Sequence, residues 1–302
     1  MPPTFQQLIP CRGVDEHIPT GGAGIIVPLG GSNTVILADG PGIRPASNTP
    51  TVQVEEITDP STLHIWSPLL PLFVPTHKLK SGAISIWKIG SHSEGTEKRE
   101  VRAKEAKLQV AVLRQTPVSV SIRPTLVRDD RGNKVSFNVA VDPQSLIDEM
   151  NSIWRPQANV VFALAKTDPA FIDGLSPESK FDINRAVTDI QANRQPPLWY
   201  TSFENNKDPA AALTMFLVRR VFDGGKPVKG TSIPGISWIS DDRSDRTMAH
   251  EAGHFLLGEP GHPSTDPDDL MPEGGPGRRV PYSLATGLYA KDTLRRLRSS
   301  QQ

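Results

Sequence analysis

The chain has a single cysteine, Cys11, so no disulfide can form within it. Its 33 basic and 33 acidic residues cancel, so no bulk charge favours nucleic acid or an anionic membrane as a partner. It contains no apolar run near the ~18 residues that a transmembrane helix needs. Its N-terminus reads MPPTFQQ, which has neither the basic stretch nor the apolar core of a Sec-type signal peptide. We therefore expect a soluble protein, either cytoplasmic or exported by a route without a signal peptide; its oligomeric state stays open.

Aromatic residues make up only 6% of the chain, whereas 29 prolines and 24 glycines indicate many turns and loops. At 302 residues the chain is long enough for two domains. Residues 1–107 are β-rich, since short apolar runs alternate with Gly-, Pro- and Asn-containing turns. The predicted strands are Gly24–Leu29, Thr34–Ala38, Leu63–Trp66 and Ala83–Ile89. We expect a small β-sandwich that resembles the Ig-like modules of bacterial surface proteins, with a boundary near Lys107.

Residues 108–302 mix strands and helices, which predicts an α+β domain. The predicted strands are Leu108–Leu113, Val118–Val127, Val160–Ala165, Leu213–Val221 and Ile236–Ile239. Helices are predicted from Asp142-Pro143, from Ser176-Pro177, from Ser244 or Asp245, and over Tyr282–Leu297.

One segment carries a pattern typical of metal chemistry: residues 250–262 read HEAGHFLLGEPGH. His250 and His254 are four residues apart, so on a helix both imidazoles lie on one face and can reach one metal ion. Glu251 stands beside the first ligand, where it can reach a water on that ion. Gly258 suits the left-handed end of the helix, after which His262 can close the site. Of the seven histidines, these three are the only ones after position 92.

The HExxH pattern, a turning glycine, a third histidine and the later Asp-Leu-Met at 269–271 together resemble the metzincin clan of zinc metallopeptidases. The resemblance covers about residues 108–302. It implies a twisted mixed sheet, a catalytic helix, a Met-turn and a C-terminal helix. It also implies one catalytic zinc ion held by His250, His254 and His262, with Met271 as the apolar floor beneath it.

The spacing departs from that family. The usual HExxHxxGxxH would place glycine at 257 and histidine at 260, but these positions hold Leu257 and Pro260. The pattern here is HExxHxxxGxxxH, two residues longer, and this puts the third ligand in doubt. Besides His262, the alternatives are Glu259, Asp266 and Asp268, which would make the site similar to gluzincin- or aspzincin-type peptidases.

If the site holds zinc, Glu251 serves as general base for hydrolysis of a peptide bond. By the resemblance, the strand before the catalytic helix, Ile236-Ser237-Trp238-Ile239, binds an extended polypeptide substrate by strand pairing. Tyr282 and Tyr289 are candidates for a phenol at the site, although a structural role is expected for both.

Two further features bear on regulation and metal content. Cys11 lies in Pro-Cys-Arg-Gly-Val-Asp, which is similar to the cysteine-switch motif of matrix metalloproteinases with Cys and Arg transposed. A thiolate from this segment could occupy the open metal position and keep the enzyme latent, but a buried structural thiol is the commoner role. Asp266, Asp268 and Asp269 could bind calcium, although an acidic loop is usually just solvated.

The sequence thus predicts a zinc endopeptidase with an N-terminal β module. A second hypothesis is a binding or assembly protein that keeps a silent peptidase fold; the intact Glu251 disfavours it. A zinc hydrolase acting on another substrate has no supporting motif.

Overall fold

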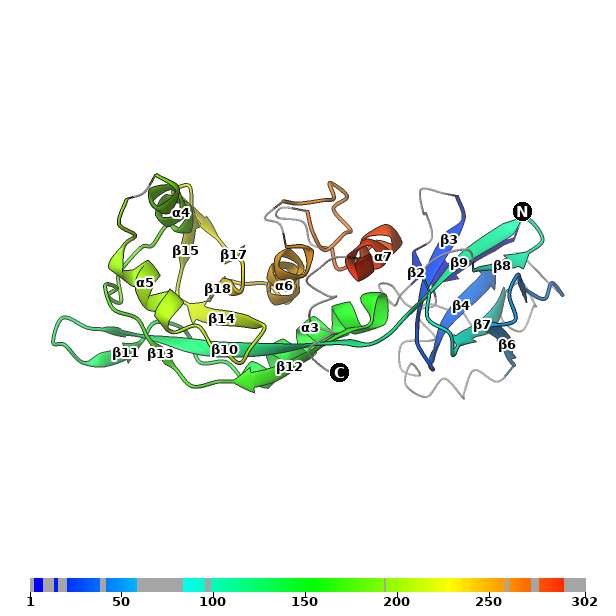
Figure 1. Ribbon diagram of the computed structural model, residues 1–302, viewed down its shortest axis with the longest axis horizontal. Helices are drawn as coiled ribbons and strands as arrows, with labels where there is room; N and C mark the ends of the chain where they lie inside the picture. Colours follow the sequence, from blue (N-terminus) through cyan, green and yellow to red (C-terminus); the bar gives the residue numbers. More distant parts are fainter. Residues whose placement is uncertain are drawn as a thin grey trace. The chain divides into compact units, whose positions relative to one another are not determined.

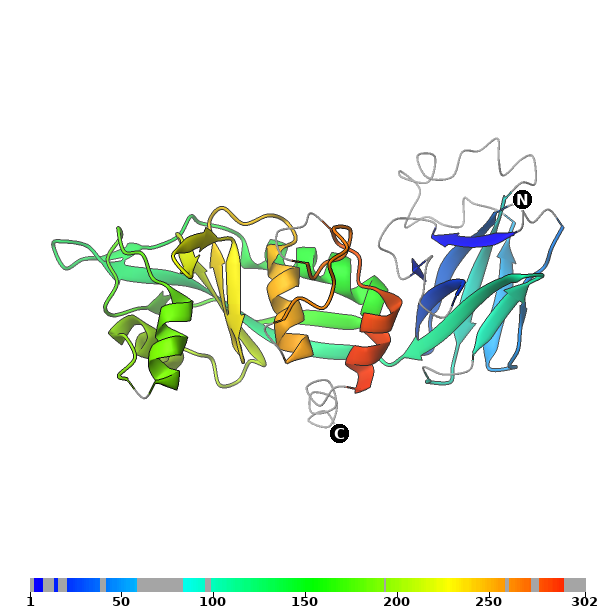
Figure 2. The same ribbon diagram turned by 90° about the horizontal axis from the view of Figure 1, so that it is seen from above.

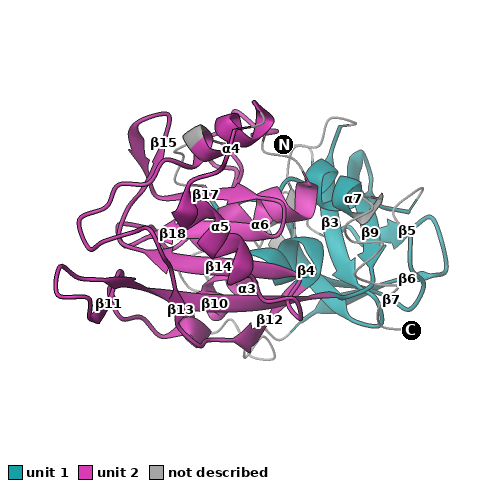
Figure 3. Ribbon diagram, turned by 60° about the vertical axis from the view of Figure 1, so that its left-hand side comes forward, with its two compact units in different colours: residues 1–116, 153–160, 278–295 teal, residues 117–152, 161–277, 296–302 magenta. Residues whose placement is uncertain are grey.

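The structure is a computed structural model of the chain. It describes residues 3–7, 14–15, 21–38, 42–58, 84–95, 99–192, 194–258, 261–272 and 277–290. The chain divides into two compact units (Figure 3): unit 1 comprises residues 1–116, 153–160 and 278–295, and unit 2 comprises residues 117–152, 161–277 and 296–302. Several sheets and a few helices make up the fold, which confirms the predicted α+β class.

Unit 1 contains two sheets that share one apolar core, as expected for a small sandwich. The first sheet has the order β1 (Thr4–Gln7), β4 (Ser32–Ala38), β7 (Ile84–Ser91), β6 (Val52–Ile57). The second has the order β2 (Val14–Asp15), β3 (Ala23–Pro28), β9 (Ala106–Leu113), β8 (Glu100–Ala103), β5 (Ala46–Ser47). Val35, Leu37 and Trp87 of the first sheet pack in the same cluster as Ile25 and Val110 of the second.

The units do not divide the chain at the predicted boundary near Lys107. That position lies inside β9, which pairs in parallel with β3 and so completes the second sheet of unit 1. Helix α7 (Tyr282–Ala290) also belongs to unit 1. The ring of Tyr282 lies so close to Gly24 that a Cβ on residue 24 would come within 2.5 Å of it. The chain therefore leaves unit 1 after Thr116 and returns to it at residues 153 and 278.

Unit 2 is built on a sheet with the order β11 (Lys134–Ser136), β10 (Thr116–Arg128), β14 (Leu213–Val218), β18 (Ile236–Ser240), β17 (Gly230–Ile233). Strands β12 (Val160–Lys166) and β13 (Ala170–Phe171) also pair with β10. Strands β10, β14 and β18 run parallel, whereas β17 is antiparallel to β18. A separate hairpin joins β15 (Val221–Asp223) to β16 (Lys226–Val228).

Unit 2 contains the helices α4 (Ile183–Gln191), α5 (Leu198–Asn205) and α6 (Thr247–Leu257) (Figure 1). Helix α3 (Pro143–Ala158) begins in unit 2, and its residues from 153 onwards belong to unit 1. Side chains alternate along β18. Ile236 and Trp238 join an aromatic core that includes Phe203 of α5, while Ser237 faces the opposite side. Figure 2 shows α6 lying beside β17 and β18.

Several predicted boundaries shift for local reasons. The helix expected from Ser176 begins at Ile183; ahead of it, Ser179 donates its backbone N–H to the Ser176 carbonyl and forms a separate turn. The strand expected over Leu213–Val221 ends at Val218, and Val221 starts the β15–β16 hairpin. The predicted strand Leu63–Trp66 lies outside the described residues, as does the predicted last helix beyond Ala290. None of the described helices combines the length and apolar character needed to cross a membrane.

Candidate metal centre

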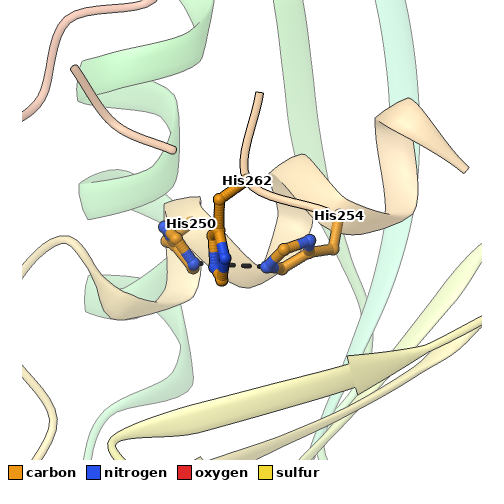
Figure 4. Close-up of side chains that lie close together, drawn as sticks. All are labelled: His250, His254 and His262. Atoms are coloured by element: carbon orange, nitrogen blue, oxygen red, sulfur yellow. Dashed lines mark hydrogen bonds between the residues drawn. The ribbon is translucent and has the colours of Figure 1, made fainter. Parts of the chain in front are cut away.

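Helix α6 presents two histidines on one face, one turn apart. His250 and His254 lie with their ring centroids 4.9 Å apart and their Nε2 atoms at 3.2 Å (Figure 4). Two nitrogens that bind one tetrahedral zinc ion at about 2.0–2.1 Å are roughly 3.3 Å apart. The helix therefore spaces the first two predicted ligands as a single ion requires.

The helix ends as the sequence predicts. Gly258 has φ +70° and ψ 22°, the left-handed conformation, and its N–H donates to the carbonyl of His254 at 3.0 Å. A residue with a Cβ would be strained at this φ, so glycine lets the chain reverse direction here. His262, four residues further along the chain, lies beside this helix.

His262 completes a cluster of three imidazoles. Its ring centroid lies 5.3 Å from that of His250 and 5.0 Å from that of His254 (Figure 4). The ligand atoms of the three residues all lie within 4.8 Å of one another. Among the described residues, this is the one group of at least three His, Cys, Asp or Glu side chains that could hold a metal ion. His250 is buried, His254 is half-buried and His262 is exposed, so the cluster opens towards solvent.

The ring of His250 is oriented by a hydrogen bond on the side away from the cluster. Its Nδ1 lies 2.7 Å from the carbonyl oxygen of Leu270. A carbonyl only accepts hydrogen bonds, so Nδ1 carries the proton and Nε2 presents its lone pair to the cluster. Burial lowers the pKa of His250 to about 4, so the ring is neutral at physiological pH, as a metal ligand must be.

These residues fit a zinc ion. Three imidazoles are a donor set that zinc prefers, and three protein ligands leave a fourth position open, as in catalytic zinc sites. Imidazole also suits copper, iron and nickel, so the donor set alone does not select zinc.

The other residues named for the metal site have different positions. Met271 follows Leu270 and is fully buried. Asp266 and Asp268 are not in the cluster, and Glu259 lies outside the described residues.

Glu251 is held against the edge strand β17. The residue is only 4% exposed, and its Oε2 accepts a hydrogen bond from the Ser232 hydroxyl at 2.6 Å. The Ser232 hydroxyl also lies 2.7 Å from that of Ser237 on β18. Burial raises the pKa of Glu251 to about 7, although the Ser232 hydrogen bond and the charge of Arg246 act in the opposite direction. The carboxyl group therefore titrates near neutrality, which suits a group that accepts and returns a proton.

Strand β18 is not the edge that the sequence led us to expect. Residues Ile236–Ile239 pair with β14 on one side and with β17 on the other, and all five residues of β18 are buried. Its backbone groups are therefore unavailable to a substrate, and this corrects the assignment of Ile236, Ser237, Trp238 and Ile239 to substrate binding. In the described part of the chain no strand pairs with the outer side of β17, whose four residues are half-buried.

Glycine is required at position 230 because of Glu251. A Cβ on residue 230 would lie 2.7 Å from Oε1 and 2.9 Å from Cγ of Glu251. We expect Gly230→Ala to displace the carboxylate and to lower kcat about 10- to 100-fold, since small misplacements of a catalytic group cost that much. Zinc content should not change. Gly287→Ala is the control, because a Cβ at 287 meets nothing within 4 Å; equal kcat for both variants would contradict this role of Gly230.

The other residues predicted for the site either lie apart from the histidine cluster or fall outside the described residues. Tyr282 packs on Gly24 in unit 1, and burial raises its pKa to about 12. The side chain of Tyr289 and all of Cys11 lie outside the described residues, so the latency switch stays a prediction. In the acidic loop, Asp269 is buried and accepts a hydrogen bond from Ser264, and Asp266 accepts one from the backbone of Asp268. Calcium stays an expectation there.

Three residues that shape the site carry no signal in the sequence. Gly230 and Ser232 lie in Lys-Gly-Thr-Ser, which reads as an ordinary turn, and their contacts with Glu251 depend on how β17 folds back along β18. Arg246, next to the helix start, resembles any charged residue of a first turn. No model of a known protein family matches this chain, and no curated protein matches it. The inference of function therefore depends on the chemistry of this site.

Proposed function

We propose that this protein is a zinc-dependent endopeptidase of the metzincin type. The observation that carries the proposal is the convergence of His250, His254 and His262. Glu251 lies on α6 with the first two of these histidines, and its carboxylate is held against the edge strand β17. The third imidazole supports a metzincin-type site over the gluzincin and aspzincin types, whose third ligand is a carboxylate. When bound, the zinc ion would supply Lewis-acid polarisation of the scissile carbonyl and activation of water near neutral pH.

In this proposal Glu251 moves the proton. The ionised carboxylate takes a proton from the attacking water and then gives it to the leaving amine. The Ser232 hydroxyl, donating to Oε2, keeps the carboxylate against β17 during both transfers. The carboxylate can then exchange a proton without leaving its place.

Strand β17 is the substrate-binding edge in this proposal. Its outer backbone groups can pair with an extended peptide, which positions the peptide by main-chain hydrogen bonds. Gly230 and Ser232 of the same strand contact Glu251, so a peptide paired there lies beside the general base.

The test is cleavage of casein by the full chain with and without zinc. We expect about one zinc ion per chain and cleavage that stops when the ion is chelated and resumes when zinc is restored. Zinc binding without cleavage of casein would favour the alternative of a silent binding or assembly protein. Absence of zinc binding would refute the proposal.

A further inference from the structure

Arg246, the residue that precedes α6, is a buried cation inside the loop that carries Met271. Only 8% of its surface is exposed. Nη1 donates to the carbonyl of Leu270 at 2.7 Å and to that of Gly277 at 3.4 Å, and Nη2 donates to that of Pro272 at 3.5 Å. Burying a guanidinium is costly unless its donors are satisfied, so these carbonyls account for its place in the fold.

Gly277, one of the residues that Arg246 contacts, lies against the backbone of Asp268. A Cβ on Gly277 would lie 2.1 Å from the backbone carbon of Asp268, so the two ends of the segment from 268 to 277 are in contact. Asp269 is buried in this segment. Arg246 therefore donates to carbonyls on both sides of this contact, those of Leu270 and Pro272 and that of Gly277.

One of these carbonyls also touches the metal cluster. The Leu270 oxygen accepts from Arg246 Nη1 and lies at the same distance, 2.7 Å, from Nδ1 of His250. A carbonyl oxygen has two lone pairs and can accept both bonds. The position of the Leu270 oxygen fixes the tautomer and ring orientation of His250, and Arg246 fixes that oxygen.

We propose that Arg246 is a positioning residue for the metal centre, acting on His250 through the shared carbonyl of Leu270. This inference deepens the proposed function and rests on it. Mutation of a group that hydrogen-bonds to a metal ligand and so orients it typically lowers metal affinity by about 10- to 100-fold. An ordinary buried ion pair or helix-capping contact would stabilise the fold without changing the histidine tautomer.

The test compares Arg246→Met, which keeps an unbranched apolar stem and removes the guanidinium with all its donors, with Arg246→Lys, which keeps the charge and replaces the planar fork with a point donor. Two quantities are measured on the full chain: zinc affinity by competition with a chelator, and the tautomer of His250 by nitrogen NMR of the metal-free protein. We expect Arg246→Met to bind zinc about 10- to 100-fold more weakly and to lose the single Nδ1-protonated form of His250. Arg246→Lys should fall between Arg246→Met and the wild type.

Arg243→Met is the matched control, because the described structure shows no hydrogen bond from its side chain to the loop at 268–277. Wild-type zinc affinity and an unchanged His250 tautomer in a folded Arg246→Met protein would overturn the inference. Failure of both Arg246 variants to fold would also overturn it, because the role would then be stability alone. If the wild-type chain binds no zinc, the proposed function fails first, and the tautomer measurement still reports on Arg246.

Discussion

Replacing Glu251 with Gln is expected to lower kcat for peptide cleavage by about 10²- to 10⁴-fold, the usual contribution of a general base. The amide keeps the shape of the side chain, and its oxygen can still accept the Ser232 hydrogen bond, but it cannot take a proton from water. The three histidines are unchanged, so zinc should bind as in the wild type. The measurement is steady-state cleavage of a peptide together with zinc content.

The same change at a surface position supplies the control. Glu178 is exposed and forms an ion pair with Arg219 at 3.6 Å, so Glu178→Gln should retain full activity. If Glu251→Gln kept wild-type kcat with zinc bound, Glu251 would not be the base. If it lost zinc as well, the effect on kcat would say nothing specific about proton transfer, and the predicted separation of binding from catalysis would be wrong.

Replacing His262 with Ala is expected to weaken zinc binding by more than ~100-fold. Loss of a group that only orients a ligand lowers metal affinity by up to that factor, and this change removes a ligand itself. His262 is exposed and lies in a loop, so the change leaves no cavity in a core and the fold should keep its stability. Activity should disappear at zinc concentrations that saturate the wild type. Zinc titration and a thermal melt of the metal-free protein measure both effects.

His92→Ala is the control, since His92 is an exposed histidine of unit 1. Unchanged zinc affinity in His262→Ala would move the third ligand to another residue. Glu259, Asp266 and Asp268 would then be tested in turn. A carboxylate ligand would replace the metzincin-type site with one similar to gluzincins or aspzincins.

The sequence predicts the three grouped histidines because their spacing follows local geometry. Four residues make about one turn of a helix, so His250 and His254 coincide on one face wherever the helix lies. Gly258 ends that helix because glycine tolerates a positive φ. His262 joins the two helical histidines although the spacing is two residues longer than in the usual motif.

The surroundings of Glu251 depend on contacts between distant segments, and local patterns do not encode these. Ser232 is 19 residues from Glu251, and the pairing of β17 with β18 decides that it faces the carboxylate. The same pairing turns Ile236–Ile239 from an expected edge into an interior strand. Strand β18 reads Ile-Ser-Trp-Ile-Ser, a mixture of apolar and small polar residues that suits an edge strand as well as an interior one, so its residues do not distinguish the two cases.

Two helices, α5 and α7, also differ from what the sequence led us to expect. No helix is predicted at α5, because the segment follows Pro196-Pro197 and has only eight residues, too few for a sustained helical pattern; in the structure its Phe203 packs on Phe216 and Trp238. Helix α7 follows the residues of the metal motif in the sequence, so it is predicted as part of the same domain. In the structure it belongs to unit 1, where Tyr282 packs against Gly24.

The most direct measurement is X-ray absorption at the zinc edge of the zinc-loaded full chain. The proposed site predicts three imidazole nitrogens at about 2.0–2.1 Å and one further light atom, with no sulfur near 2.3 Å. In His262→Ala the protein that still holds zinc should show two imidazoles. A sulfur ligand would instead place Cys11 on the metal, and fewer than three imidazoles in the wild type would contradict the site formed by His250, His254 and His262.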